Sequence, residues 1–299
     1  MIPRIPIFAA AALLAPALKA AHAEGDQLVV PARTILPGAI NGVGSGMMVI
    51  PNGLSMPVLS PEVAERLSLS RSIFGVQARV GNAKLPGHTG VVRLKLGGVE
   101  QKRRVLWFTR PQRPSAAAVM GPGAVSQSVV TFTFAPFDAT AHAFEFPLVR
   151  QNNRMGTLAR VGSASLFIMW DLGRDRSLAT AAAASALAAS YAGVLVGKPR
   201  QEIIEFGLER PVQSVRLGDA FALGPLRMRE FDARTTDYGS TTGIQNADGD
   251  ANEIIVTAKG RKDRSLYTFT VGARDMQGCS RLEFDKRAAV IRLYCARAG

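Results

Sequence analysis

Short runs of alternating apolar and polar residues constrain the fold of this chain more than any other feature of its sequence. The alternation is clear in residues 91–96, 267–271 and 290–294, and Gly, Pro or Asn separates such runs every few positions. Side chains of a β-strand point to opposite faces in turn, so a period of two is typical of strands with one buried face. The sequence therefore predicts an all-β fold built from many short strands.

Two stretches break this pattern and predict helices. Ser60 and Pro61 suit the N-cap and the first position of a short helix that runs to about Leu67. Residues 180–190 are rich in alanine, which has the highest helix propensity. Residues 235–252 are polar and rich in Gly and Thr, so we expect a loop there. Its Asp-Gly-Asp sequence lacks the remaining ligand spacing of a calcium site.

Composition narrows the range of functions. Hydrophobic residues make up 47% of the 299 positions, enough to bury a globular core. The formal charge of +13 comes from basic residues scattered among apolar runs, and only 7% of residues are aromatic. Nucleic-acid binding, which needs a basic stripe with stacking aromatics, is therefore not expected. With three His and two Cys residues, we expect neither a metal centre nor a cofactor.

The N-terminus has the layout of a secretory signal peptide. Arg4 gives a positive start, residues 5–18 are almost entirely apolar, and residues 21–23 (Ala-His-Ala) supply small residues at a cleavage point. Residues 1–23 are therefore predicted to be removed on export to the periplasm or the exterior, with no transmembrane segment left in the chain. A buried N-terminal helix is the alternative, although prolines interrupt the run.

The two predicted helices stand in similar surroundings. A shift of 120 residues lays residues 47–67 over 167–187 without a gap, and each stretch reads as an apolar strand, a Gly turn, a short strand and a helix. Farther along, residues 119–121 (Val-Met-Gly) match residues 270–272 (Thr-Val-Gly) with a shift of 151. We therefore predict an internal duplication, with a coincidental order of β-elements as the alternative.

This order resembles the aspartic peptidases of the pepsin and retropepsin superfamily. Each lobe of those proteins has an apolar strand, an Asp-Thr/Ser-Gly loop, a helix and a later apolar-apolar-Gly segment. Residues 167–173 resemble the catalytic loop of one lobe, and residues 47–53 resemble that of the other. The resemblance implies a bilobal acid-protease-like fold from two β-rich halves, residues 24–150 and 151–299, with one short helix after each catalytic-type loop and a cleft between the lobes.

The resemblance makes Asp171 the candidate catalytic carboxylate and Gly173 the residue that lets its loop turn tightly. The alternative is that Asp171 only caps a turn. Enzymes of the family hold two carboxylates close together, so that the pair shares one proton and acts as base and acid. Here Pro51, Asn52 and Gly53 stand where the other Asp-Thr-Gly would be. Because proline cannot transfer a proton, we expect the first-lobe loop to be a degenerate counterpart.

Three functions remain open from the sequence. The first is an exported aspartic-peptidase-like protein, catalytically degraded, whose cleft binds an extended peptide or protein ligand through main-chain hydrogen bonds. The second is an active aspartic endopeptidase, a hydrolase that activates water with Asp171 and takes its second carboxylate from another chain of a homodimer. The third is a non-enzymatic scaffold of the cell envelope. No oligomeric state is predicted.

Two other polar residues, Asp175 and His88, have two interpretations each. Asp175 either supplies a second carboxylate or pairs with the arginines beside it. Asp138 and Asp285 stand at comparable strand ends, where aspartate favours turns. His88 lies in a Pro- and Gly-rich segment that we expect to be the tip of a first-lobe flap hairpin, where it either contacts a ligand or stays exposed.

The two cysteines are predicted to form a disulfide. If the last two strands form a hairpin around residues 286–288, the numbers of paired residues add to 574, as do those of Cys279 and Cys295. Opposed residues of an antiparallel ladder bring their Cβ atoms close enough for a disulfide, and export provides an oxidising environment. Two buried free thiols are the alternative.

Overall fold

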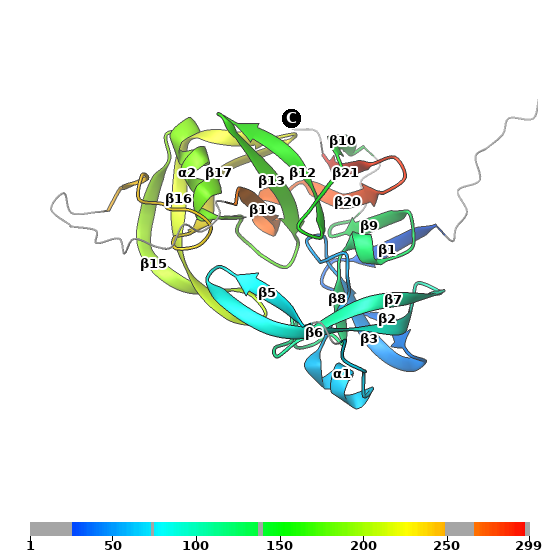
Figure 1. Ribbon diagram of the computed structural model, residues 1–299. Coiled ribbons are helices and arrows are strands. Elements are labelled where there is room, and N and C mark those ends of the chain that lie inside the picture. Colours follow the sequence, from blue (N-terminus) through cyan, green and yellow to red (C-terminus); the bar gives the residue numbers. More distant parts are fainter. Residues whose placement is uncertain (1–25, 73–74, 137–139, 249–265, 297–299) are drawn as a thin grey trace, which may run out of the picture.

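The computed structural model describes residues 26–72, 75–136, 140–248 and 266–296, which form three β-sheets (Figure 1). The only α-helices in these ranges are α1 (Pro61–Arg66) and α2 (Ala181–Ser190), so the all-β expectation is confirmed. The predicted signal peptide lies outside the described residues. No helix in the described ranges has the length and apolar character needed to cross a membrane.

Two large sheets are built from successive parts of the chain. The first has the strand order β2-β3-β8-β4-β7-β6-β5, and the second has the order β11-β12-β13-β19-β14-β17-β16-β15-β18. The strands of the first are β2 (Leu36–Ile40), β3 (Val43–Val49), β4 (Val58–Leu59), β5 (Val76–Val80), β6 (Ala83–Leu96), β7 (Val99–Phe108) and β8 (Ala118–Met120). Those of the second are β11 (Val149–Gln151), β12 (Arg154–Val161), β13 (Ala164–Asp171), β14 (Leu178–Ala179), β15 (Val194–Glu205), β16 (Leu208–Leu223), β17 (Leu226–Arg234), β18 (Gln245–Asn246) and β19 (Thr268–Gly272).

A third sheet combines strands from both parts of the chain. Its order is β1-β9-β20-β21-β10, in which β9 and β20 are antiparallel neighbours. The strands are β1 (Gln27–Pro31), β9 (Val129–Thr133), β10 (His142–Pro147), β20 (Cys279–Asp285) and β21 (Val290–Cys295). Hydrogen bonds across this sheet therefore tie the first half of the chain to its C-terminal end.

The two large sheets share a pattern of strand pairing. In the first, β3 is parallel to β8, and β4 is antiparallel to β8 and parallel to β7. In the second, β13 is parallel to β19, and β14 is antiparallel to β19 and parallel to β17. A helix follows β4, and the other helix follows β14.

Registers within these sheets correct the gapless shift of 120 residues. In the hairpins β2–β3 and β12–β13, Leu36 pairs with Met47 and Thr157 pairs with Ile168, so a shift of 121 relates them. The shift of 120 relates β4 to β14. The loop after β3 therefore contains one residue more than the loop after β13.

Both helices begin where the sequence predicts. The Ser60 hydroxyl accepts a hydrogen bond from the Val63 amide at 3.3 Å and caps α1, with Pro61 at its first position. Thr180 is the N-cap residue of α2, but its hydroxyl bonds to the neighbouring β19 segment, donating to the Leu266 carbonyl. Because most side chains of α2 are small and buried alanines, the helix packs closely into the second sheet.

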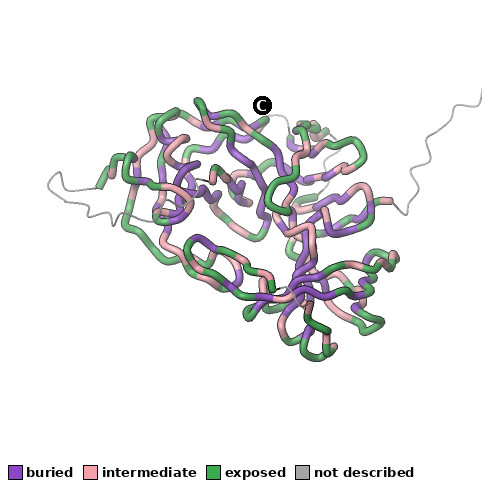
Figure 2. The backbone as a smooth tube through the Cα atoms, viewed as in Figure 1, coloured by how far each residue is buried: buried purple, intermediate pink, exposed green. Residues whose placement is uncertain are grey.

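A continuous apolar core supports the end of β13. Buried residues run through the strands of all three sheets (Figure 2). Trp170, which is fully buried, contacts Phe146 of β10 and Phe284 of β20, with ring centroids 5.8 and 6.3 Å apart. The strand that carries Asp171 is therefore fixed against the third sheet.

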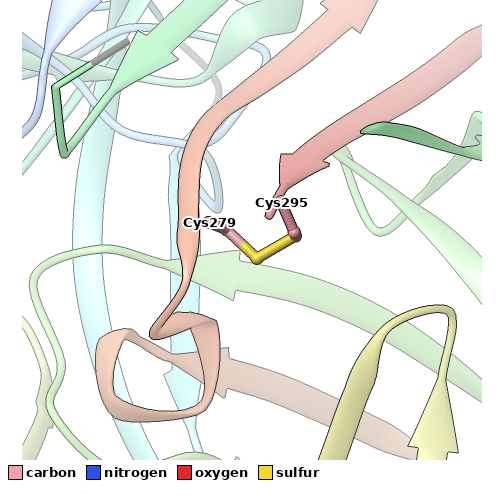
Figure 3. The surroundings of a disulfide bond; sticks show 2 residues. All are labelled: Cys279 and Cys295. Carbon is pink, nitrogen blue, oxygen red and sulfur yellow. A yellow bond between two sulfur atoms is a disulfide. The ribbon is translucent and has the colours of Figure 1, made fainter. Parts of the chain in front are cut away.

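Cys279 and Cys295 form the predicted disulfide (Figure 3). The register that led to this prediction is wrong by one residue, because Arg281 pairs with Tyr294 and Asp285 with Val290. An irregularity between Cys279 and Arg281 restores the pairing of the two cysteines. A β-bulge of this kind adds one residue to one strand, an effect that counting along the sequence does not include.

His88 does not lie at a hairpin tip, contrary to our expectation. It pairs with Trp107 in the middle of the long strand β6, and the tip of the β5–β6 hairpin is formed by Gly81 and Asn82. The expected loop after β17 is confirmed up to Asp248, apart from the two-residue strand β18. Residues 249–252 of that segment lie outside the described residues.

Candidate functional site

The candidate site is centred on Asp171, the last residue of β13. Its side chain is buried, with the residue 6% exposed, and its two carboxylate oxygens have different donors. Oδ1 accepts a hydrogen bond from the Gly173 amide at 2.9 Å, and Oδ2 accepts one from the Asn52 Nδ2 atom at 3.1 Å. The structure therefore brings together two loops that the sequence singled out, although 119 positions separate Asp171 from Asn52.

The turns in these two loops correspond to each other at a shift of 121 residues. The match made from the sequence used a shift of 120. The Gly53 amide donates to the Ile50 carbonyl at 3.0 Å, and the Arg174 amide donates to the Asp171 carbonyl at 3.3 Å. By this turn pattern Ile50, not Pro51, occupies the position that Asp171 occupies in the other loop. Asn52 then corresponds to Gly173 of the other loop, and its side-chain amide donates to the Asp171 carboxylate.

Each of the two loops accepts a hydrogen bond from one arginine of the other half of the chain. The Arg33 Nε atom donates to the Leu172 carbonyl at 2.9 Å, and the Arg154 guanidinium donates to the Asn52 carbonyl. Arg33 precedes β2 and Arg154 begins β12, so the two follow the same shift of 121 residues as the hairpins. Charged donors to carbonyl oxygens make strong hydrogen bonds, so these contacts hold the loops in place. Neither arginine was predicted from the sequence.

A cavity of about 1240 Å³ lies over the two loops. Its walls come from both large sheets: all of β5, the end of β7, the loops after β3 and β13, and the segment that joins β15 to β16. Asn52, Asp171 and Gly173 lie in its wall. Both charged residues and apolar ones such as Leu54, Met56 and Ile204 line the cavity.

The β5–β6 hairpin crosses to the second half of the molecule and docks there by polar contacts. The Gly81 amide donates to the Tyr238 hydroxyl at 3.1 Å, and this hydroxyl donates to the Arg79 carbonyl at 3.2 Å. Gly81 has a φ of +63°, and an added Cβ would lie 1.9 Å from an oxygen of Asp237. The tip therefore requires glycine both for its turn and for this close approach.

Asp237, beneath that tip, is completely buried between two arginines. Arg210 donates to both of its oxygens, at 2.8 and 2.5 Å, and Arg234 donates to Oδ2 at 2.5 Å. Burial raises the pKa of Asp237, but the hydrogen bonds and charges of Arg210 and Arg234 outweigh it and hold that pKa below 3.8. The carboxylate is therefore a fixed anion that supports the hairpin tip.

The β15–β16 hairpin crosses in the opposite direction and docks mainly by apolar contacts. Phe206 at its tip is 2% exposed and packs edge-on against Phe108 of β7, with ring centroids 4.9 Å apart. Beside it, Glu205 accepts hydrogen bonds from Arg154 at 2.7 Å and from Gln112 at 2.8 Å. Because Arg154 also holds the Asn52 carbonyl, this hairpin is connected to the loop that faces Asp171.

The other predicted carboxylates do not pair with Asp171. Asp175 has a side chain that is 72% exposed, which agrees with its interpretation as a surface residue, but the arginine 3.7 Å away is Arg274 and not one of the arginines beside it in the sequence. Asp285 accepts hydrogen bonds from two amides of its own turn, and Asp138 lies outside the described residues. Asp275, whose pKa is raised by burial, accepts its hydrogen bond from Ser177.

Sequence reasoning also missed Asp232, a buried carboxylate of the cavity wall. It lies 3.3 Å from Arg176 and 2.6 Å from Arg200. Its place in a strand gave no signal, because a charged residue in an alternating run usually faces solvent. In the described ranges no three His, Cys, Asp or Glu side chains gather closely enough to hold a metal ion.

No protein-family model matches the chain, and a search of curated proteins finds no significant match.

Proposed function

We propose that this chain is an exported, aspartic-peptidase-like protein that binds an extended peptide in its cavity without hydrolysing it. Three features support the family resemblance. Both large sheets have the same strand pairings, a helix follows the same short strand in each, and the loops after β3 and β13 meet at Asp171. An internal duplication with a bilobal acid-protease-like arrangement is part of this proposal.

The observation that carries the non-hydrolytic function is the hydrogen bond from Asn52 to Asp171. Peptide hydrolysis by a carboxyl pair requires one group to accept a proton from water while the other donates one to the substrate. A carboxamide does not exchange a proton in this way, and Ile50 at the matched turn position has no polar group. Asp171 is therefore left to bind ligand donors and to fix the loop.

The shape of the cavity supports an extended ligand. Strand β5 lies at the edge of the first sheet, and all five of its residues line the cavity. An edge strand presents alternate amide and carbonyl groups that an added peptide strand can use. The active homodimer is less well supported, because Asn52 of the same chain already occupies the side of Asp171 that a second carboxylate would need.

A randomised peptide library tests this function. The chain without residues 1–23 should retain library members on a column and cleave none of them between pH 3 and pH 8, as read by mass spectrometry. The Asp171→Asn variant should retain peptides more weakly, because it loses the charged acceptor for a ligand N–H, and it should likewise cleave none of them. Cleavage that disappears in this variant would establish an active peptidase, and a lack of any retention would favour the scaffold function.

The Asn52→Asp variant tests whether the side chains at positions 52 and 171 face each other. It places a second carboxyl group about 3.1 Å from the Asp171 carboxylate, if the side chain keeps its position. Two carboxylates at this distance are coupled, so one pKa should rise well above its ordinary range. An NMR titration of the variant should show this shift, whereas an undisturbed titration would mean that the two loops do not face each other as described.

A further inference from the structure

Arg113, an arginine of the cavity wall close to Asp171, has no carboxylate partner in the part of the chain that the structure describes. Seven arginines line the cavity, and five of them form ion pairs: Arg154, Arg174, Arg176, Arg200 and Arg234. Within the described residues, the side chains of Arg79 and Arg113 make neither an ion pair nor a hydrogen bond. Arg79 is exposed on β5, whereas Arg113 is half-buried, so an unpaired charge at Arg113 is the more costly one.

Arg113 and Asp171 face each other across Gly173. A Cβ on Gly173 would lie 3.3 Å from the Arg113 Nη2 atom and 3.1 Å from the Asp171 Oδ1 atom, yet the two side chains do not form an ion pair. The absence of a side chain at Gly173 leaves this point open to the cavity. A ligand group placed there is in reach of a guanidinium on one side and of a carboxylate on the other.

The two sides of this gap require different ligand groups. A guanidinium binds a carboxylate through two parallel hydrogen bonds, a geometry that few other groups match. On the other side, Asp171 Oδ1 already accepts the Gly173 amide, but a carboxylate oxygen can accept a second donor from a ligand. The Asn52 Oδ1 atom of the facing loop is buried and has no hydrogen-bond partner within the described ranges. A ligand that carries a carboxylate close to an N–H group satisfies both Arg113 and Asp171. Peptides provide this combination.

We propose that the cavity recognises its peptide by a carboxylate group bound to Arg113, with a neighbouring ligand N–H donated to Asp171. The proposal rests on the peptide-binding function inferred above and specifies the chemistry of its ligand. The carboxylate belongs either to the C-terminus of the peptide or to an Asp or Glu side chain. Both sources present the same group to Arg113, and the choice of peptide library distinguishes them.

Fluorescence anisotropy with four peptide libraries tests the proposal on the chain without residues 1–23. The libraries are randomised over uncharged residues and end in a free acid, in an amide, in an amide with one internal Glu, or in an amide with one internal Gln. We expect the free-acid library or the Glu library to bind at least tenfold more tightly than its uncharged counterpart. Tighter binding of the free acid identifies a C-terminus, and tighter binding of the Glu library identifies a side chain.

Three variants show whether Arg113 causes this preference. Arg113→Gln should reduce it to less than twofold, while Arg79→Gln, which removes the other unpaired arginine, should leave it unchanged. Gly173→Ala should weaken binding of all libraries, because its methyl group fills the gap; its backbone has no left-handed φ, so the variant should fold normally. Thermal unfolding and circular dichroism verify that each variant is folded.

The outcomes separate this proposal from the function on which it rests. If no library binds the unmodified chain, peptide binding itself is wrong. If all four libraries bind equally, or if Arg113→Gln keeps the carboxylate preference, only the assignment of Arg113 is wrong. If Arg79→Gln abolishes the preference instead, the carboxylate site lies on β5 and not beside Asp171.

Discussion

The two hairpins that cross between the large sheets reach similar positions by different physical means. The β5–β6 tip is held by hydrogen bonds to Tyr238 and rests on the buried, ion-paired Asp237. The β15–β16 tip is held by the aromatic ring of Phe206, which is buried against an apolar cluster of the first sheet. Polar docking depends on exact positions and on protonation, whereas apolar docking depends mainly on the area removed from water.

The difference also appears in the backbone of the two tips. Gly81 and Gly207 both have a φ of +63°, but an added Cβ meets Asp237 in the first case and nothing within 4 Å in the second. Phe206 itself has a φ of +55°, a conformation that costs a bulky residue free energy. Burial of its ring against Phe108 offsets that cost, so the anchor and not the turn accounts for the stability of the apolar tip.

The largest effect is expected from removal of this anchor. Phe206→Ala should lower the free energy of unfolding by about 3 kcal/mol, because a buried phenyl ring leaves a cavity among Phe108 and its neighbours. Urea denaturation measures this change. Phe206→Asn, which suits the turn better, should recover only part of the loss. An Asn variant as stable as the unmodified protein would show that the turn, not the anchor, limits stability.

A smaller effect is expected from a methyl group at the polar tip. Gly81→Ala and Gly207→Ala share the cost of a left-handed alanine, about 1 kcal/mol, but only the first adds a clash with Asp237. Overpacking of this kind should make Gly81→Ala about 2 kcal/mol less stable than Gly207→Ala in the same urea experiment. Equal stabilities would mean that the β5–β6 tip is not docked on Asp237 in solution.

The smallest effect is expected in acid and only at the polar tip. Since the pKa of Asp237 is lower in the folded state than its ordinary value of 3.8, its contribution to stability is complete above that value. It is lost as the pH falls below 3.8 through the folded-state pKa. Hydrogen-exchange protection of residues 79–82 should then fall more than that of residues 204–207. In Asp237→Asn, protection of the polar tip should not change over this pH range.

Much of the fold could be predicted from the sequence, because the signals were local. Alternation located the strands, Ser60 and Pro61 located the start of α1, and the alanine-rich run located α2. The disulfide was predicted although the register was wrong by one residue, since a bulge next to Cys279 compensates for the error. His88 was misplaced because Pro and Gly indicated a turn within a strand that continues through them.

The candidate site was only partly predictable. Asp171, Gly173 and Asn52 were singled out by their resemblance to a catalytic loop, and the structure places all three in one cavity wall. The first loop contains one extra residue, so Ile50 and not Pro51 corresponds to Asp171. An alignment without gaps cannot show this.

The sequence by itself determined the β-rich architecture, both helices and the presence of a carboxylate in only one of the two loops. Only the tertiary structure decided that Asn52 faces Asp171, that Arg33 and Arg154 cross to hold the loops, and that each hairpin docks on the other half. The physical reason is range: strand and helix signals arise between residues a few positions apart. Side-chain directions across more than a hundred positions are fixed only when the sheets pack.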